Sequence, residues 1–307
     1  PDKEGFSMAM ANEISELEQK NTWTLVKRSD MKKAGRKALS STWAFRRKRY
    51  PDGSIRKLKA RLCVRGDQQT QGVDFFKSYS PVVHWTTIRL VLLLSIVFNW
   101  ATVQTDYTNA FAQASLSEEV YMNIPRDFAP TTTGDDFVLK LNKSLYGLRQ
   151  APLSWYEHLR THLEQRGFKR SALDSCLFYD KTKKIMCLIY VDDVIWIAPD
   201  KQRISTVLDS LKDDLEMTVE GDISAFLGID FERQENGKIK LKQRGLIDRI
   251  LQTTGLSACN SDKTPASTTP LGTDKDGKPF SEEWNYASVV GMLLYLASNS
   301  RPEISYA

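Results

Sequence analysis

The stretch from Lys184 to Ala198, KIMCLIYVDDVIWIA, decides how the centre of this chain folds. Two adjacent aspartates, Asp192 and Asp193, separate two apolar segments rich in the β-branched and aromatic residues that strands favour. This pattern predicts an antiparallel hairpin that turns at residues 190–194. Gly and Asn, the best residues for a tight turn, are absent there, so the two carboxylates need a reason of their own.

A structural Asp-Asp turn is one reading of these carboxylates, because Asp is common in turns. The other is a cation site at the tip of a rigid hairpin, since carboxylate oxygens suit hard ions such as Mg²⁺, which also accept phosphate oxygens. Reactions on nucleotides commonly use two such ions, and two ions need at least one further carboxylate. Asp106, at the end of the strand-like segment TVQTD, is the best candidate, with a helix N-cap as its alternative role.

The overall composition fits a folded globular chain of about two domains, because 41% of the 307 residues are hydrophobic. The net charge is only +5, from 43 Lys and Arg against 38 Asp and Glu. Nine of the basic residues and a single acid, Asp52, lie between Arg46 and Arg65. A cationic surface of this density suits a polyanion, although a solvated strand face has the same composition.

The turn-forming residues 51–54 lie inside this basic segment and predict a second hairpin. Side chains alternate between the two faces of a strand, so the second arm has one apolar and one cationic face. The apolar set is Leu58, Ala60, Leu62 and Val64, and the cationic set is Lys57, Lys59, Arg61 and Arg65. We expect the first set in the core and the second facing solvent or a ligand.

The remaining segments alternate between helical and strand patterns, which predicts an α+β fold with a mixed sheet at its centre. An N-terminal helix is expected to bury Met10, Ile14 and Leu17, and the segment 257–278 is expected to be a linker. Other helices are predicted over residues 86–101, 151–166, 202–217, 245–255 and 284–299, and a third hairpin over residues 225–242 that turns at 235–237.

Several classes of protein are excluded or disfavoured. The four cysteines show no Cys-x-x-Cys spacing, and no Gly-rich loop ends in Lys-Ser/Thr, so neither a zinc site nor a P-loop is indicated. The longest apolar run, Leu90 to Phe98, falls short of the ~20 residues that span a bilayer. Because the chain starts PDKEGF, without Met or a signal peptide, we expect it to be a piece of a longer polypeptide.

Two further clusters are weaker candidates for a site. His158 and His162 are four residues apart on a predicted helix, but HLRTH lacks the glutamate of a zinc-protease helix, so packing is the preferred interpretation. Asp213 and Asp214 end an amphipathic helix, where solvated carboxylates are expected.

The hairpin sequence YVDDV resembles the catalytic hairpin of reverse transcriptases, and the surrounding motifs resemble the copia-type branch found in LTR retrotransposon Pol polyproteins. The motifs follow the family's order over nearly the whole chain. They are NTWTLV, KARLCVRGDQQTQGVDFFKSYSPVV, IRLVLLL, VQTDYTNAF, EEVYMNIPRDF, LYGLRQAPLSW, YVDDV, FLGI, the Thr264-Pro265 pair and VVGMLLYLASNSRPEISYA.

This resemblance implies a right-hand polymerase that copies an RNA or DNA template into DNA with two Mg²⁺ or Mn²⁺ ions. Asp106, Asp192 and Asp193 become the catalytic, metal-binding triad, with Asp193 the more peripheral. The expected domains are an N-terminal segment and fingers over 1–100, the palm over 101–232, the start of the thumb over 233–256, and a linker with a C-terminal helix over 257–307.

The resemblance also implies nucleotide-binding and primer or template contacts. Phe111 is expected to stack beneath the sugar and favour dNTP over NTP, and Gly147 to let the backbone approach the nucleotide. The nucleotide-binding set is Lys57, Lys59, Arg61, Phe111, Tyr146, Gly147 and Gln150. The primer and template set is Arg65, Tyr190, Phe226, Leu227 and Gly228, of which Phe226 to Gly228 belong to the primer grip.

The implied partners are a primed template, dNTP and the adjoining RNase H and integrase regions of the polyprotein, with no membrane. The implied location is the cytoplasm, inside a virus-like particle, and the nucleus. Tyr107, Leu153 and Glu303 depart from the family's usual residues, and FAQASL lacks a common Gly. A catalytically silent nucleic-acid-binding remnant and a metal-dependent nuclease or phosphatase are the alternative functions.

Overall fold

The computed structural model describes residues 2–49, 54–126, 128, 136–235, 237–260, 264, 276–277 and 283–306. The chain divides into two compact units, Pro1–Gly221 and Asp222–Ala307, and has the predicted α+β composition. Most of the predicted linker 257–278 and three of the four residues of the predicted turn 51–54 lie outside the described residues.

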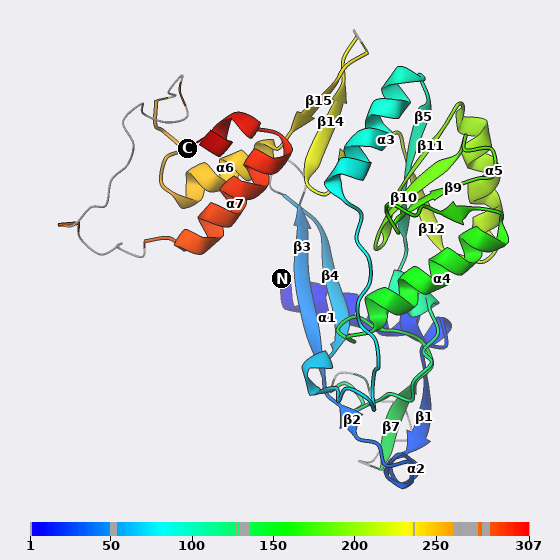
Figure 1. Ribbon diagram of the computed structural model, residues 1–307. Coiled ribbons are helices and arrows are strands. Elements are labelled where there is room, and N and C mark those ends of the chain that lie inside the picture. Colours follow the sequence, from blue (N-terminus) through cyan, green and yellow to red (C-terminus); the bar gives the residue numbers. More distant parts are fainter. Residues whose placement is uncertain are drawn as a thin grey trace. The chain divides into compact units, whose positions relative to one another are not determined.

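A six-stranded antiparallel sheet forms the centre of the first unit, with the strand order β12-β5-β11-β10-β9-β8 (Figure 1). Its strands are β5 (Ala101–Tyr107), β8 (Lys169–Arg170), β9 (Leu177–Tyr179), β10 (Met186–Tyr190), β11 (Asp193–Ala198) and β12 (Met217–Gly221). The hairpin predicted around the two aspartates is therefore present, and β11 lies between β10 and β5.

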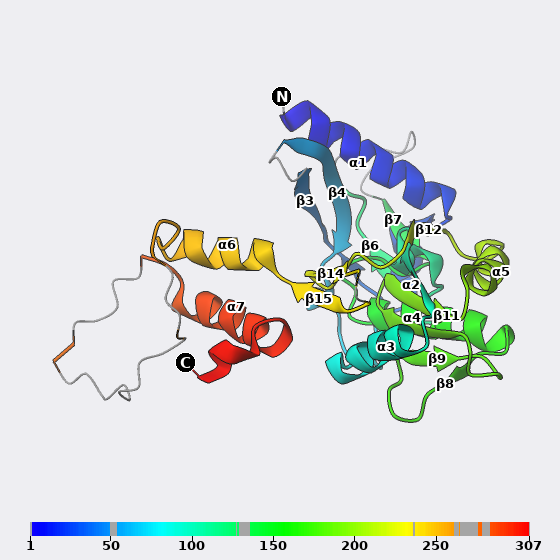
Figure 2. The ribbon, with the colours of Figure 1, turned by 90° about the horizontal axis from the view of Figure 1, so that it is seen from above.

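Helices α3 (Trp85–Val97), α4 (Ala151–Gln165) and α5 (Lys201–Lys212) pack around this sheet (Figures 1 and 2). Every residue of β11 after Asp193 is buried, so both faces of this strand are covered. The buried residues of α4 include Trp155, Leu159 and Leu163, which recur every four residues along the predicted helix.

A smaller mixed sheet, with the order β1-β7-β6-β2, has one parallel pair, β2 with β6. Its strands are β1 (Trp23–Lys27), β2 (Ala38–Leu39), β6 (Tyr121–Met122) and β7 (Phe137–Leu141), and α2 (Arg28–Lys33) follows β1. The basic segment forms the predicted hairpin of β3 (Ser41–Arg49) and β4 (Ile55–Val64), which pair with each other alone among the described strands.

Helix α1 (Asp2–Gln19) packs along this hairpin (Figure 2). Ile14 and Leu17 are buried, as their spacing predicted. Phe6 packs against Phe45 with ring centroids 4.9 Å apart. On β4, Ala60, Leu62 and Val64 are buried as predicted, and Leu62 and Val64 join the core cluster of Ile14 and Leu17, whereas Leu58, also expected in the core, is only half-buried.

Several boundaries differ from the sequence prediction, among them the end of the helix predicted over 202–217, which stops at Lys212 because Met217 already pairs within β12. The helix predicted over 86–101 ends at Val97, because Asn99 adopts φ +49° and Ala101 already pairs within β5. Helix α4 ends at Gln165, and Gly167 follows with φ +83°, a left-handed conformation that favours glycine. Among the described residues, no helix is both long and apolar enough to cross a membrane.

The second unit contains a three-stranded antiparallel sheet and two helices. Its elements are β13 (Ala225–Phe226), β14 (Ile229–Arg233), β15 (Ile239–Lys242), α6 (Arg244–Thr253), α7 (Tyr286–Asn299) and the 3-10 helix η3 (Pro302–Tyr306). The predicted hairpin is formed by β14 and β15. Helix α7 begins two residues later than predicted because the Asn285 side chain accepts a hydrogen bond from Ser288 N at 2.8 Å and caps it.

Candidate active site

The turn between β10 and β11 consists of only two residues, Val191 and Asp192, because Tyr190 and Asp193 pair directly. Val191 adopts φ +55°. A β-branched residue in the left-handed region costs of the order of 1–2 kcal/mol. Backbone strain of this kind clusters at functional sites, so the turn is held in a shape that its sequence does not favour.

Two neighbouring elements hold this turn by its carbonyl groups. The Trp155 indole Nε1, from α4, donates a hydrogen bond to the Val191 carbonyl at 2.7 Å. The backbone N of Tyr107, from β5, donates to the Asp192 carbonyl at 3.0 Å. Tyr107 and Trp155 pack edge to face with centroids 5.1 Å apart, and both are fully buried. The turn therefore rests on two rigid elements.

The three aspartates come together from β5 and the turn. Asp106 pairs with Asp193 across the sheet, and Asp106 and Asp192 line one cavity of about 260 Å³. Asp193 is half-buried and is not part of the lining. That Asp193 is the more peripheral metal ligand stays a prediction.

Burial and neighbouring carboxylates raise the pKa values of Asp106 and Asp193. Burial, followed by the charges of Asp192 and Glu220, raises the pKa of Asp106. Burial, followed by the charges of Asp192 and Asp106, raises the pKa of Asp193 to about 6. A bound cation would relieve this repulsion. Glu220, on β12, was not identified from the sequence, because only the β12–β5 pairing brings it near Asp106.

The cationic face of β4 forms the opposite wall of the same cavity. Lys57, Lys59 and Arg61 line it, together with Lys48 from β3. Burial, followed by the charges of Arg61 and Lys48, lowers the pKa of Lys59. The Arg61 Nε is buried without a hydrogen-bond partner among the described residues. An anionic ligand would supply what these groups lack.

Two acidic side chains of α1 also line the cavity, and the sequence did not identify them. Glu13 is buried, its Oε1 accepts a hydrogen bond from Leu62 N at 3.3 Å, and burial raises its pKa. Glu16 accepts a hydrogen bond from Asn109 Nδ2 at 2.8 Å. The cavity thus carries four carboxylates, from Glu13, Glu16, Asp106 and Asp192, against four cationic side chains.

The donor set suits divalent ions that arrive with a phosphate ligand. Over the ranges that the structure describes, no three His, Cys, Asp or Glu side chains form a complete metal site. Asp106 and Asp192 nevertheless provide carboxylate oxygens in one cavity, and Mg²⁺ is commonly bound by one or two carboxylates with substrate phosphates completing its shell. The cationic wall lies where such phosphates would need partners.

The aromatic side of the site is built by Phe111 and Tyr146. Phe111 lies in the 3-10 helix η2 (Ala110–Gln113), and its ring packs against Tyr146 with centroids 4.7 Å apart. The Arg61 guanidinium lies over the Tyr146 ring at 4.4 Å. Tyr146 lines the cavity, whereas Phe111 lies behind it and is not among the lining residues.

Gly147 has a structural requirement that the sequence did not predict. Its φ is +90°, and a Cβ atom there would lie 2.1 Å from the Val64 carbonyl oxygen. The Tyr146 carbonyl accepts a hydrogen bond from Val64 N at 2.8 Å. The close backbone approach that requires glycine is therefore made to β4, and Gly147 does not line the cavity.

Gln150 lies apart from the two carboxylates. It is buried, its Nε2 donates to the Asp74 carbonyl at 2.8 Å, and its Oε1 accepts from Gln69 Nε2 at 2.9 Å. It lines a different cavity, of about 450 Å³, that contains neither Asp106 nor Asp192. The structure thus gives Gln150 a buried hydrogen-bond network rather than a place in the cavity of the two carboxylates.

The remaining predicted contacts are distributed over both units. Arg65 is exposed and forms an ion pair with Asp67 at 2.6 Å. Tyr190 ends β10 beside the turn. In the second unit, Phe226 ends β13, and Leu227 and Gly228 connect that strand to β14.

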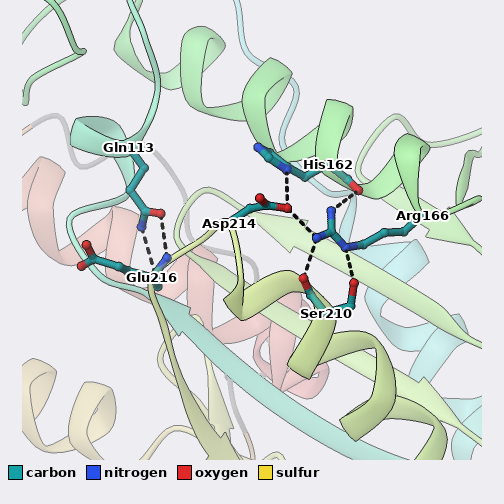
Figure 3. Close-up of polar contacts among 6 residues, drawn as sticks. All are labelled: Gln113, His162, Arg166, Ser210, Asp214 and Glu216. Carbon is teal, nitrogen blue, oxygen red and sulfur yellow. Dashed lines mark hydrogen bonds and ion pairs between the residues drawn. The ribbon is translucent and has the colours of Figure 1, made fainter.

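Asp214 is exposed, as expected for a solvated carboxylate, and it also takes part in a polar cluster at the end of α4. Asp214 accepts a hydrogen bond from Arg166 NH2 at 2.6 Å and lies 3.5 Å from His162 Nδ1 (Figure 3). These contacts join the end of α4 to the residues after α5. His158 packs between Trp155 and His162, as expected, and burial followed by the His162 charge lowers its pKa to about 4.

Comparison with known proteins agrees with this geometry. The family described as reverse transcriptase (RNA-dependent DNA polymerase) matches residues 20–268. The retrovirus-related Pol polyprotein from transposon RE2 of Arabidopsis thaliana is 35% identical over 98% of this chain and 20% of its own length. The corresponding polyprotein from transposon TNT 1-94 of Nicotiana tabacum is 32% identical over 100% of this chain and 24% of its own.

One solved structure, described as a foamy viral protease-reverse transcriptase in complex with ds DNA, aligns with 94% of this chain and 40% of its own at 13% identity and a TM-score of 0.43. The chain spans about a fifth to a quarter of the length of the two plant polyproteins. Because the family match covers most of the chain and the ordered motifs agree with it, the chain belongs to the reverse transcriptase (RNA-dependent DNA polymerase) family, in its copia-type branch.

Proposed function

We propose that this chain catalyses RNA-directed DNA synthesis for a copia-type retrotransposon, by transferring a nucleotide from dNTP to a primer 3′-hydroxyl. The observation that carries the proposal is one cavity in which Asp106 and Asp192 face the cationic side chains of β4. In the proposed right-hand polymerase, residues 1–100 would form the N-terminal segment and fingers, and residues 101–232 the palm. Residues 233–256 would begin the thumb, and 257–307 would form a linker and C-terminal helix. The sites of action are the cytoplasm, within a virus-like particle, and the nucleus.

Divalent ions are generally used in this family, and we propose two, Mg²⁺ or Mn²⁺, that neutralise charge on the attacking and leaving oxygens. Asp106 and Asp192 would hold them, with Asp193 placed behind by the strand pairing. A new bond forms between the primer 3′-oxygen and the α-phosphorus as the hydroxyl loses its proton. The bond from that phosphorus to the bridging oxygen breaks, and pyrophosphate leaves.

The protein's own contribution is positioning and charge. Lys57, Lys59 and Arg61 would bind the triphosphate, and the unpartnered Arg61 Nε is available for a phosphate oxygen. Tyr146 and Phe111 would form the wall beside the sugar. Arg65, Tyr190 and the connection at Phe226 to Gly228 are proposed to contact template and primer.

The α1 carboxylates, Glu13 and Glu16, should weaken binding of the triphosphate. In the protein alone, Glu13 and Glu16 share the cavity with the cationic wall, so they compete with an incoming triphosphate for the same charges. Burial raises the pKa of Glu13, which makes its neutral form easier to reach when an anion enters. Nucleotide affinity should therefore increase in a Glu13→Gln protein.

The test is primer extension by the unmodified chain on oligo(dT)-primed poly(rA), with dTTP, in Mg²⁺, in Mn²⁺ and in EDTA. Extension in either metal and none in EDTA is the expected result. Salt-sensitive binding of the duplex without extension would instead favour a silent binding remnant. Cleavage of a labelled duplex without added dTTP would favour a nuclease that uses the same carboxylates.

A further inference from the structure

Gln113, at the end of η2, uses its whole side-chain amide to bind the backbone of two other segments. Its Nε2 donates to the carbonyls of Thr108 and Glu216 at 2.8 and 2.9 Å. Its Oε1 accepts a hydrogen bond from Glu216 N at 2.9 Å. Figure 3 shows the two contacts to Glu216 as a parallel pair of the kind that neighbouring strands make.

This side chain extends the pairing of β5 with β12. The last strand pair joins Tyr107 to Met217, and Thr108 N still donates to the Glu216 carbonyl at 3.1 Å. Asn109 then adopts φ +48° and turns the chain away from β12. The Gln113 amide returns to the same backbone position, so the loop that follows β5 is fixed at both ends to Glu216, the residue before β12.

The fixed loop carries Phe111, which packs against Tyr146, the ring of this pair that lines the cavity. Phe111 lies between Asn109 and Gln113, and its ring contacts Tyr146 at a centroid distance of 4.7 Å. Tyr146 in turn lies beneath Arg61 at 4.4 Å. A shift of the loop would therefore move Phe111 relative to Tyr146, with no change in the aspartates on β5 and the β10–β11 turn.

We propose that Gln113 is a positioning residue that sets the place of the Phe111–Tyr146 wall and thereby the preference for dNTP over rNTP. This inference rests on the proposed polymerase function. Because Tyr146 lines the cavity and Phe111 packs against it, a displaced Phe111 would change the contacts of a bound sugar through the position of Tyr146. An apolar wall favours a substrate without the extra hydroxyl by about a hundredfold at most in kcat/KM. When the wall is displaced, we expect this preference to fall about tenfold.

The decisive experiment measures the ratio of kcat/KM for dTTP to that for UTP on the same primed template. Gln113→Met has nearly the same length but makes none of the three hydrogen bonds, and its ratio should fall about tenfold. Gln113→Glu keeps the acceptor oxygen but replaces the donor with a carboxylate oxygen that repels the two carbonyls. The ratio should therefore fall at least as far as in Gln113→Met. Gln202→Met, at an exposed site on α5, is the matched control and should keep the parent ratio.

A double-variant comparison separates positioning from general damage. Phe111→Ala should lower the same ratio, and adding Gln113→Met to Phe111→Ala should lower it no further, because Gln113 acts through the wall. If Phe111→Ala relaxes the ratio and Gln113→Met leaves it at the parent value, the inference is wrong. A full additional loss in the double variant would also contradict it.

Hydrogen–deuterium exchange of the protein alone provides a readout that needs no turnover. The amides of residues 108–116 and of Glu216 should exchange faster in Gln113→Met and at the parent rate in Gln202→Met. Absence of DNA synthesis by the parent protein would overturn the proposed function and, with it, the role in sugar selection. Unchanged exchange in Gln113→Met would separately overturn the claim that Gln113 fixes the loop.

Discussion

Two turns of this chain, one in each compact unit, are built alike and differ at one position. Val191-Asp192 connects β10 to β11, and Leu227-Gly228 connects β13 to β14. In each, a bulky first residue has a positive φ, +55° at Val191 and +52° at Leu227. An aromatic side chain donates a hydrogen bond to that residue's carbonyl in each, from Trp155 Nε1 at 2.7 Å and from the Tyr295 hydroxyl at 2.6 Å.

The second residue of the turn differs in kind. Gly228 has φ +73°, so both central residues of its turn have the positive φ of a type I′ hairpin, in which glycine is favoured. Asp192 occupies the matching position in the other turn and points its carboxylate into the cavity with Asp106. The Val191-Asp192 turn therefore has a charged residue at the position where glycine would suit the backbone better.

The difference between Asp192 and Gly228 explains why the surrounding side chains and hydrogen-bond donors hold one turn more firmly than the other. Trp155 is fully buried, and a second donor, Tyr107 N, holds the Asp192 carbonyl. Tyr295 is 36% exposed. A turn with unfavourable residues needs a rigid surrounding, and a carboxylate that has to bind a metal within a fraction of an ångström needs the same rigidity.

The largest effect should come from the partner carboxylate of the charged turn. Asp106→Asn should lower the rate of dTTP addition by about a thousandfold, since losing a charged metal ligand removes several kcal/mol of transition-state stabilisation. The fold should persist, because the change removes repulsion among the carboxylates. Single-turnover kinetics measures the rate of dTTP addition, and circular dichroism measures whether the fold persists. A rate within tenfold of the parent would show that Asp106 is not a metal ligand.

The two aromatic donors should differ in their contribution to stability. Trp155→Phe leaves the half-buried Val191 carbonyl without its indole donor and should cost about 2 kcal/mol of unfolding free energy. Tyr295→Phe frees a carbonyl next to an exposed side chain and should cost about 0.5 kcal/mol, because water replaces the hydroxyl. Urea unfolding monitored in each unit compares them, and equal losses would refute the difference in support.

The raised pKa of Asp193, beside Asp106, should make the unfolding free energy depend on pH. The pKa of Asp193 is raised to about 6 from 3.8, so its stabilising, protonated form is fully present below pH 3.8 and is lost as the pH rises through 6. In metal-free buffer, Asp193→Asn should match the parent at pH 3.5 and exceed its unfolding free energy by about 1 kcal/mol at pH 7, after allowance for solvent screening. Parallel pH curves for the two proteins would contradict the shift.

The smallest expected effect is the relief of backbone strain. Val191→Gly and Leu227→Gly should each raise the unfolding free energy by about 0.5 kcal/mol, because the gain from an unstrained φ exceeds the entropy that glycine adds to the unfolded chain. Val191→Gly should also slow dTTP addition, since the carboxylate of Asp192 becomes less well positioned. Thermal unfolding checks the first effect, and destabilisation by both changes would show that neither turn is strained.

The sequence predicted those parts of the fold and site that depend on local pattern. Alternation along β4 indicated which of its side chains are apolar and which are cationic, and the flanking apolar runs indicated the hairpin that carries Asp192. Both follow from the two-residue period of a strand. The strand-like segment TVQTD also indicated Asp106 as the best further carboxylate, whereas the pairing of β5 with β11 that brings it to the turn joins segments distant in sequence.

The sequence could not predict features that depend on which segments meet. Glu13 and Glu16 reach the cavity only because α1 packs along β4, and nothing in their helical spacing identifies that surface. Gly147 is required by the Val64 backbone and Gln150 by Gln69 and Asp74, contacts between segments far apart in the chain. Each of these residues has a role fixed by tertiary packing.

The central claim is that the charged turn carries the chemistry, and single-turnover addition of dTTP to a primed poly(rA) template tests it most directly. Asp192→Asn should leave less than about a thousandth of the parent rate. Asp213→Asn, which changes an exposed aspartate at the end of α5, should retain the parent rate. If Asp192→Asn extends the primer as fast as Asp213→Asn, the turn is structural and the proposed active site is wrong.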